Sequence, residues 1–172
     1  EQMSHYIHLN GSEDDVAVPT AAFNAVYQLG HIMIHIEDEG IGLRQLVDYF
    51  YVLRNLGPGK SETKENIKRI WKRLGMMKLA SVVMWIEKNM LGLDDDYLLV
   101  PPDEKKGLFL AEDILEGGNF GHSSKRQKYN KYGKVAKRMA DLWHLIRLSS
   151  CFPGEAFFRI CSKAKTFCLK FI

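Results

Sequence analysis

Residues 20 to 53 read TAAFNAVYQLGHIMIHIEDEGIGLRQLVDYFYVL, and this stretch decides the fold of the chain. In its first half, apolar residues recur with a helical period and cover much of the circumference. We therefore expect a buried helix from 20 to 37, with the opening threonine as its N-cap. Gly40 and Gly42 break that pattern, and a second helical stripe runs from 43 to 53. The stretch predicts two helices joined by a glycine-containing corner.

The rest of the chain predicts further helices separated by glycine and proline turns. Gly57-Pro58-Gly59 ends the second helix, and residues 94 to 102 are expected to form a loop. Further helices are expected at 61–74, 77–91, 103–115, 124–148 and 155–172. The helix at 124–148 has a basic, exposed first half and an apolar second half. The predicted fold is mostly α, an orthogonal bundle of six to seven helices.

Residues 1 to 18 differ from the helical body. Two short apolar pieces, His5 to Leu9 and Val16 to Val18, flank the turn-rich residues 10 to 15. They are typical of short strands, either as a β-hairpin or as the last strands of an upstream sheet. We expect residues 19 to 172 to form one helical domain and a further region to precede the chain.

Composition favours an ordinary globular protein of the cytoplasm. The chain has 172 residues, 46% of them hydrophobic and 26% charged, and its net charge is +3. Its cysteines are odd in number and include no CxxC pair, so we interpret them as free thiols of a reducing compartment. They are Cys151, Cys161 and Cys168. No run of about 18 apolar residues and no signal peptide occur, which predicts no contact with a membrane.

Three polar residues of the decisive stretch could carry chemistry. His31, His35 and Glu39 are spaced i, i+4 and i+8, so they share one side of a helix that persists to residue 39. Helical zinc proteases place a glutamate directly after the first histidine, where this chain has Ile32. We favour histidines that hydrogen-bond in or near the core. The sequence assigns no metal site, and His31 and His35 are the candidates if one exists.

The glycine corner offers a phosphate site. Gly40 and Gly42 allow a ligand to approach the backbone at the start of a helix, and Arg44 lies in its first turn. The alternative is a structural corner in which Arg44 pairs with Glu39 or Asp48.

A second glycine-rich stretch, residues 117 to 123, includes Asn119 and His122. Seven Lys or Arg and no acid follow between Lys125 and Arg138. Exposed N–H groups beside Lys125 could hold a phosphate or a sugar phosphate. The alternative is a solvated basic helix face. General binding of nucleic acid is not expected, because the net charge of the whole chain is only +3.

The quoted residues resemble a known family. The string His31-x3-His35-x3-Glu39-Gly-Ile-Gly-Leu-Arg-Gln-Leu-x-Asp48 resembles the C-terminal half of the nucleotidyltransferase-like proteins common in Bacteroides-like bacteria. Ile114 to Gly121 and Arg147 to Glu155 resemble the same family, so that the likeness covers nearly the whole chain.

The resemblance implies an upstream catalytic domain of the same polypeptide, whose Gly-Ser loop and paired aspartates bind a nucleoside triphosphate and Mg²⁺. This chain has no such motif, since Gly11-Ser12 leads only to a turn. We therefore expect the chain alone to be inactive and to help position a nucleotide or a phosphorylated small molecule. The substrate-binding residues that we predict are His35, Glu39, Arg44, Asn119, His122 and Lys125.

A second hypothesis, of a different class, assigns the chain no enzymatic role. In it, the chain is a helical interaction module that binds an anionic partner through the basic face of residues 125 to 138.

Overall fold

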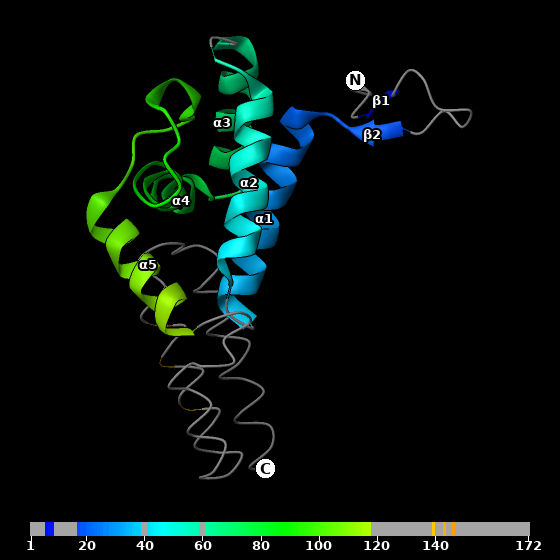
Figure 1. Cartoon of the computed structure of the whole chain (residues 1–172). Coiled ribbons are helices and arrows are strands. Elements are labelled where there is room, and N and C mark those ends of the chain that lie inside the picture. The colour runs from blue at the N-terminus through cyan, green and yellow to red at the C-terminus, as the bar shows by residue number, and fades with distance from the viewer. Residues whose placement is uncertain are drawn as a thin grey trace, which may run out of the picture.

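The described part of the chain is mostly helical, as predicted (Figure 1). The computed structural model describes residues 6–8, 17–38, 41–58, 61–117, 139, 143 and 146. These residues form five α-helices, one 3-10 turn and two short strands. The orthogonal bundle of six to seven helices stays a prediction, because the expected helices at 124–148 and 155–172 fall almost wholly outside the described residues.

The two strands precede the helices and pair with each other. Strand β1 (Tyr6–His8) runs antiparallel to β2 (Ala17–Pro19), with Ile7 opposite Val18. The short strands predicted on either side of the turn-rich segment are therefore confirmed. In Figure 1 this small sheet projects sideways from the start of the first helix.

Helices α1 (Ala21–Asp38) and α2 (Leu43–Leu56) pack side by side as an antiparallel hairpin. Thr20 is the predicted N-cap of α1, since its Oγ1 accepts the backbone N–H of Phe23 at 3.3 Å. Gly57 ends α2 with a φ of +74°, a conformation that glycine adopts without strain, and its N–H donates to the carbonyl of Arg54. Both helices therefore form where sequence pattern and end signals agree.

Three further helical elements complete the described body. They are α3 (Ser61–Arg73), α4 (Met77–Asn89) and α5 (Glu104–Gly117). Each lies within two residues of its predicted bounds. The expected loop before α5 contains a 3-10 turn, η1 (Asp95–Tyr97). Among the described residues, no helix has both the length and the apolar character that crossing a membrane needs.

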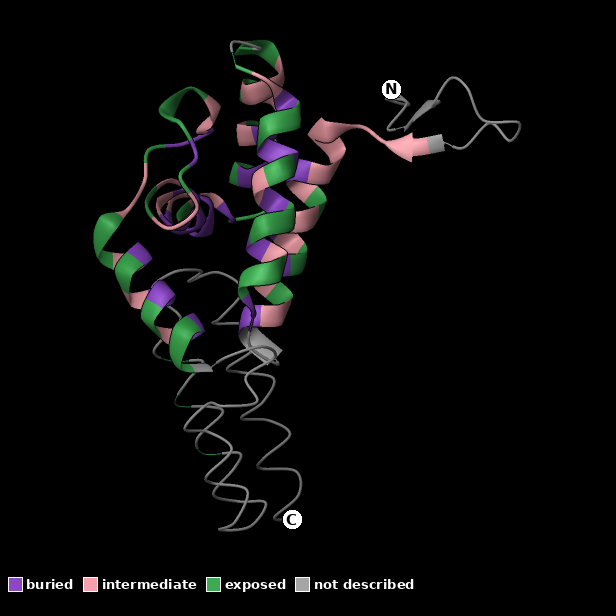
Figure 2. Cartoon of the chain, viewed as in Figure 1, coloured by how far each residue is buried: buried purple, intermediate pink, exposed green. Residues whose placement is uncertain are grey.

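Helix α4 lies at the centre of the described core, and helices α2, α3 and α5 pack against it. Seven of its thirteen residues are buried, and these are coloured purple in Figure 2. An apolar helix of this kind is stable only when neighbours cover most of its surface. Its buried residues are Leu79, Ala80, Val82, Val83, Met84, Ile86 and Glu87.

Of the residues predicted on the apolar half of helix 124–148, the structure describes three. Met139, Trp143 and Ile146 are helical, as expected. Their side chains are 50 to 60% exposed, so at these positions the stripe is not buried in a core.

The close approach of α5 to α4 depends on one glycine. A Cβ atom at Gly107 would lie 2.5 Å from Cγ and Cδ2 of Trp85. Carbon atoms that are not bonded to each other do not approach so closely. The α5 backbone can pack against the indole ring of Trp85 only because residue 107 has no side chain. At Gly30 of α1, by contrast, a Cβ would meet only the Cε of Met76, at 3.8 Å.

These two glycines predict opposite effects of the same substitution. Gly30→Ala should stabilise the protein by up to about 1 kcal/mol, because alanine favours a helix and finds an ordinary contact. Gly107→Ala should destabilise it by about 1 to 2 kcal/mol, because the steric conflict with Trp85 exceeds the gain in helix propensity. Urea unfolding of both variants measures the difference. Equal stabilisation by both would contradict the described packing of α5 on α4.

Candidate functional site at the corner of α1 and α2

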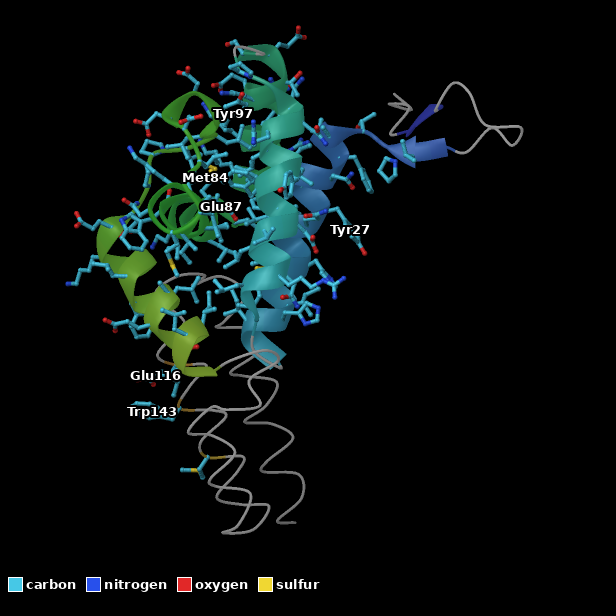
Figure 3. All side chains as sticks on the ribbon, in the orientation of Figure 1. Tyr27, Met84, Glu87, Tyr97, Glu116 and Trp143 are labelled. Atoms are coloured by element: carbon cyan, nitrogen blue, oxygen red, sulfur yellow. The ribbon has the colours of Figure 1, made fainter. Side chains whose placement is uncertain are left out.

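One face of α1 carries four rings in successive turns. Phe23 and Tyr27 are stacked, with ring centroids 5.9 Å apart, and Tyr27 stacks in turn on His31 at 6.1 Å. His35 meets His31 edge to face at 4.3 Å. Tyr27 is 58% exposed, and in Figure 3 its side chain points away from the helical body. We call these four residues the aromatic ladder.

The two histidines of the ladder contact each other through one atom of each ring. Nε2 of His31 lies 3.0 Å from Nε2 of His35, a hydrogen-bond distance in which one ring donates and the other accepts. His31 is exposed and His35 half-buried. We expected histidines that hydrogen-bond in or near the core, and the structure describes a hydrogen bond between the two rings on the outer side of α1.

The corner itself begins α2. Gly42 is the N-cap residue, and its backbone N–H donates to Oε1 of Gln45 at 3.2 Å. Arg44 is exposed in the first turn, which contains no acidic residue. Within the described residues, no ion pair with Asp48 or another side chain engages Arg44, and the alternative partner Glu39 lies outside them.

The structure brings some of the predicted site residues together and does not describe others. His35 lies in the last turn of α1 and Arg44 in the first turn of α2, so both lie at the same end of the hairpin. Four predicted residues lie outside the described residues: Glu39, Asn119, His122 and Lys125. The basic segment 125–138 and the three cysteines also lie outside them.

A buried carboxyl group on α4 was not predicted. Glu87 is fully buried, and neither of its carboxyl oxygens has a hydrogen-bond partner among the described residues (Figure 3). Burial raises the pKa of Glu87 from its ordinary value of 4.5 to about 9, so the group is a neutral acid at pH 7. A sequence signal could have revealed the burial of Glu87. The residue lies on the apolar stripe of α4, four residues after Val83.

Glu87 influences a tyrosine on the neighbouring helix. Burial, and secondly the charge of Glu87, raises the pKa of Tyr49 well above its ordinary 10.0. The Tyr49 hydroxyl therefore stays protonated and donates to the carbonyl of Ala25 at 3.2 Å, which ties α2 to α1. Because Glu87 is closed off from solvent, we treat this pair as structural and do not place it in the candidate site.

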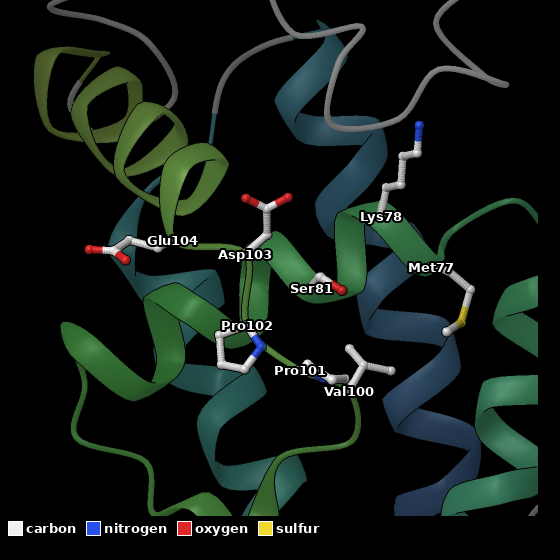
Figure 4. A pocket seen from close by; sticks show the side chains of 8 residues that line it. All are labelled: Met77, Lys78, Ser81, Val100, Pro101, Pro102, Asp103 and Glu104. Atoms are coloured by element: carbon white, nitrogen blue, oxygen red, sulfur yellow. The ribbon is translucent and has the colours of Figure 1, made fainter.

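A hollow of about 540 Å³ lies between the first turn of α4 and the segment that leads into α5 (Figure 4). Asp103 belongs to the packing there, because its N–H donates to the carbonyl of Ser81 at 3.0 Å. Its carboxylate also caps α5 by accepting the N–H of Lys106 at 3.1 Å. The hollow is lined by Met77, Lys78, Ser81, Val100, Pro101, Pro102, Asp103 and Glu104. We interpret this hollow as part of the packing between α4 and the start of α5.

The acidic run at residues 94 to 96 is also structural. Asp95 pairs with Lys88 at 2.5 Å, and the backbone carbonyl of Asp96 accepts a hydrogen bond from Lys64 at 2.5 Å. These contacts hold η1 against α3 and α4. Nowhere in the described ranges do three or more metal-ligating side chains come together.

Comparison with known proteins found no match. No protein-family model, curated protein or solved structure matches the chain. The resemblance to nucleotidyltransferase-like proteins therefore stays a prediction.

The buried carboxyl predicts how stability depends on pH. Between pH 4.5 and about 9, folded Glu87 keeps a proton that the unfolded chain releases. Its contribution to stability is therefore fully present below pH 4.5 and is lost progressively as the pH rises to about 9. Relative to Glu87→Gln, the wild-type free energy of unfolding should fall by about 1.4 kcal/mol per pH unit over this range.

Chemical unfolding at pH 5, 6, 7 and 8 measures that difference. Glu87→Asp is the control, since it keeps an ionisable group at this position and should keep the slope. Parallel pH curves for wild type and Glu87→Gln would show that residue 87 releases its proton equally in both states.

Proposed function

We propose that this chain is the helical part of a cytoplasmic nucleotidyltransferase-like protein, and that its α1–α2 corner holds the phosphate of a nucleotide or of a phosphorylated small molecule. The parent protein would bind the nucleoside triphosphate and Mg²⁺ mainly through an upstream catalytic domain. The observation that supports this proposal is the exposed guanidinium of Arg44 in the first turn of α2.

The start of α2 suits an anion for two physical reasons. The first N–H groups of a helix have no partner within it, and the helix dipole adds a partial positive charge there. Gly42 has no side chain that could cap those groups. Arg44 adds a full charge and a planar set of donors that matches the oxygen atoms of a phosphate.

The end of α1 adds further polar groups. Because α1 and α2 form an antiparallel hairpin, His35 and its partner His31 lie towards the end of the hairpin that carries Arg44. An imidazole N–H donates a hydrogen bond to a phosphate oxygen. The corner thus combines an arginine, helix N–H groups and imidazoles, with no acid in the first turn of α2.

Thermal unfolding with ligands tests this proposal. Each of ATP, CTP, GTP and UTP is added to the chain, with and without Mg²⁺, at several concentrations. A nucleotide at ten times its Kd stabilises the folded state by about 1.4 kcal/mol, which raises the Tm by roughly 3 to 6 °C. We expect Arg44→Ala to abolish the rise caused by the nucleotide that binds.

The matched control is Arg69→Ala, which removes an exposed arginine from α3. It should leave the ligand-induced rise unchanged. Loss of the rise in both variants would indicate non-specific attraction of charge. If no nucleotide stabilises the wild-type chain, the corner is not a phosphate site and the proposal fails.

A further inference from the structure

We propose that His31 and His35 form a two-imidazole binding site for a divalent transition-metal ion on the exposed face of α1. The two proposals share His31 and His35 but are tested independently, because the metal is expected to bind without any nucleotide.

The distance between the two rings fits a chelate. Their Nε2 atoms lie 3.0 Å apart on successive turns of one helix. Two metal–nitrogen bonds of about 2.1 Å that meet at a right angle place the two nitrogen atoms about 3.0 Å apart. A right angle is the angle between neighbouring ligands in octahedral and square-planar complexes. One metal ion can therefore bind both rings with little movement of the helix.

The aromatic ladder holds one of the rings in place. Tyr27 stacks on His31 with only 8° between the ring planes, and Phe23 stacks on Tyr27 with 10° between them. Such stacking restricts the rotamers of His31 before a metal arrives, which lowers the entropy cost of binding.

Binding requires a change of tautomer in one of the two rings. In the contact between the rings, one Nε2 donates and the other accepts. A metal ion needs a lone pair on both Nε2 atoms, so the donating ring moves its proton from Nε2 to Nδ1. Both rings then present an Nε2 lone pair to the ion.

The ligands select the class of metal. Imidazole nitrogen suits Zn²⁺, Cu²⁺ and Ni²⁺, whereas Mg²⁺ and Ca²⁺ prefer oxygen ligands. His31 is exposed, so an ion from solution can reach the pair. The described residues supply no group of three ligands, so within them the pair provides two of the coordination positions of the ion.

Isothermal titration of the untagged chain with NiCl₂ and ZnCl₂ tests the site, and MgCl₂ serves as the negative control. We expect one Ni²⁺ or Zn²⁺ per chain and no heat from Mg²⁺. His31→Ala and His35→Ala should each weaken binding at least tenfold. Circular dichroism confirms that these variants remain folded.

His144→Ala is the matched control, since it removes one imidazole at another point of the sequence. It should leave the affinity within a factor of two of wild type. Two results would overturn the proposal: no binding of Ni²⁺ or Zn²⁺ by the wild-type chain, or equal affinity in wild type and both folded alanine variants at positions 31 and 35.

Discussion

The burial of α4 is the constraint on which the rest of the described structure depends. Seven of its thirteen residues are buried, so neighbouring helices must cover it on several sides. Helices α3 and α5, which precede and follow it, pack against it together with α2. The α1–α2 hairpin is fixed in turn, because the Tyr49 hydroxyl links α2 to the backbone of α1. The exposed corner and the aromatic ladder are therefore carried on a hairpin that the core holds in place.

That same core contains a carboxyl group, which apolar packing alone would not select. Two carboxyl oxygens of Glu87 and the indole N–H of Trp71 are buried without a hydrogen-bond partner among the described residues. A buried polar group without a partner costs about 1 to 3 kcal/mol, and an ionised one costs more. Protonation of Glu87 lowers that cost, so the fold tolerates an acid at its centre by keeping it neutral.

Sequence reasoning succeeded where the signals are local. Thr20, Gly57 and the glycine between α3 and α4 mark helix ends through groups a few residues away, and apolar periodicity locates the helices between them. It failed for the contact of Gly107 with Trp85, because that contact depends on which helices become neighbours. It also missed Glu87, although the apolar stripe of α4 placed that residue among buried positions. The spacing of His31 and His35 predicted a shared helix side, but not that this side is exposed. Predicted residues such as Asn119 and His122 lie outside the described residues, so that part of the candidate site stays a prediction.

The contact between Gly107 and Trp85 makes these two positions a coupled pair in the evolution of the protein. A lineage that acquires a side chain at position 107 first would meet the indole ring and lose stability. A lineage that first exchanges Trp85 for a smaller residue would open space, and position 107 could then vary. The order of the two changes is therefore restricted, and related chains with any residue other than glycine at 107 should carry a smaller residue at 85.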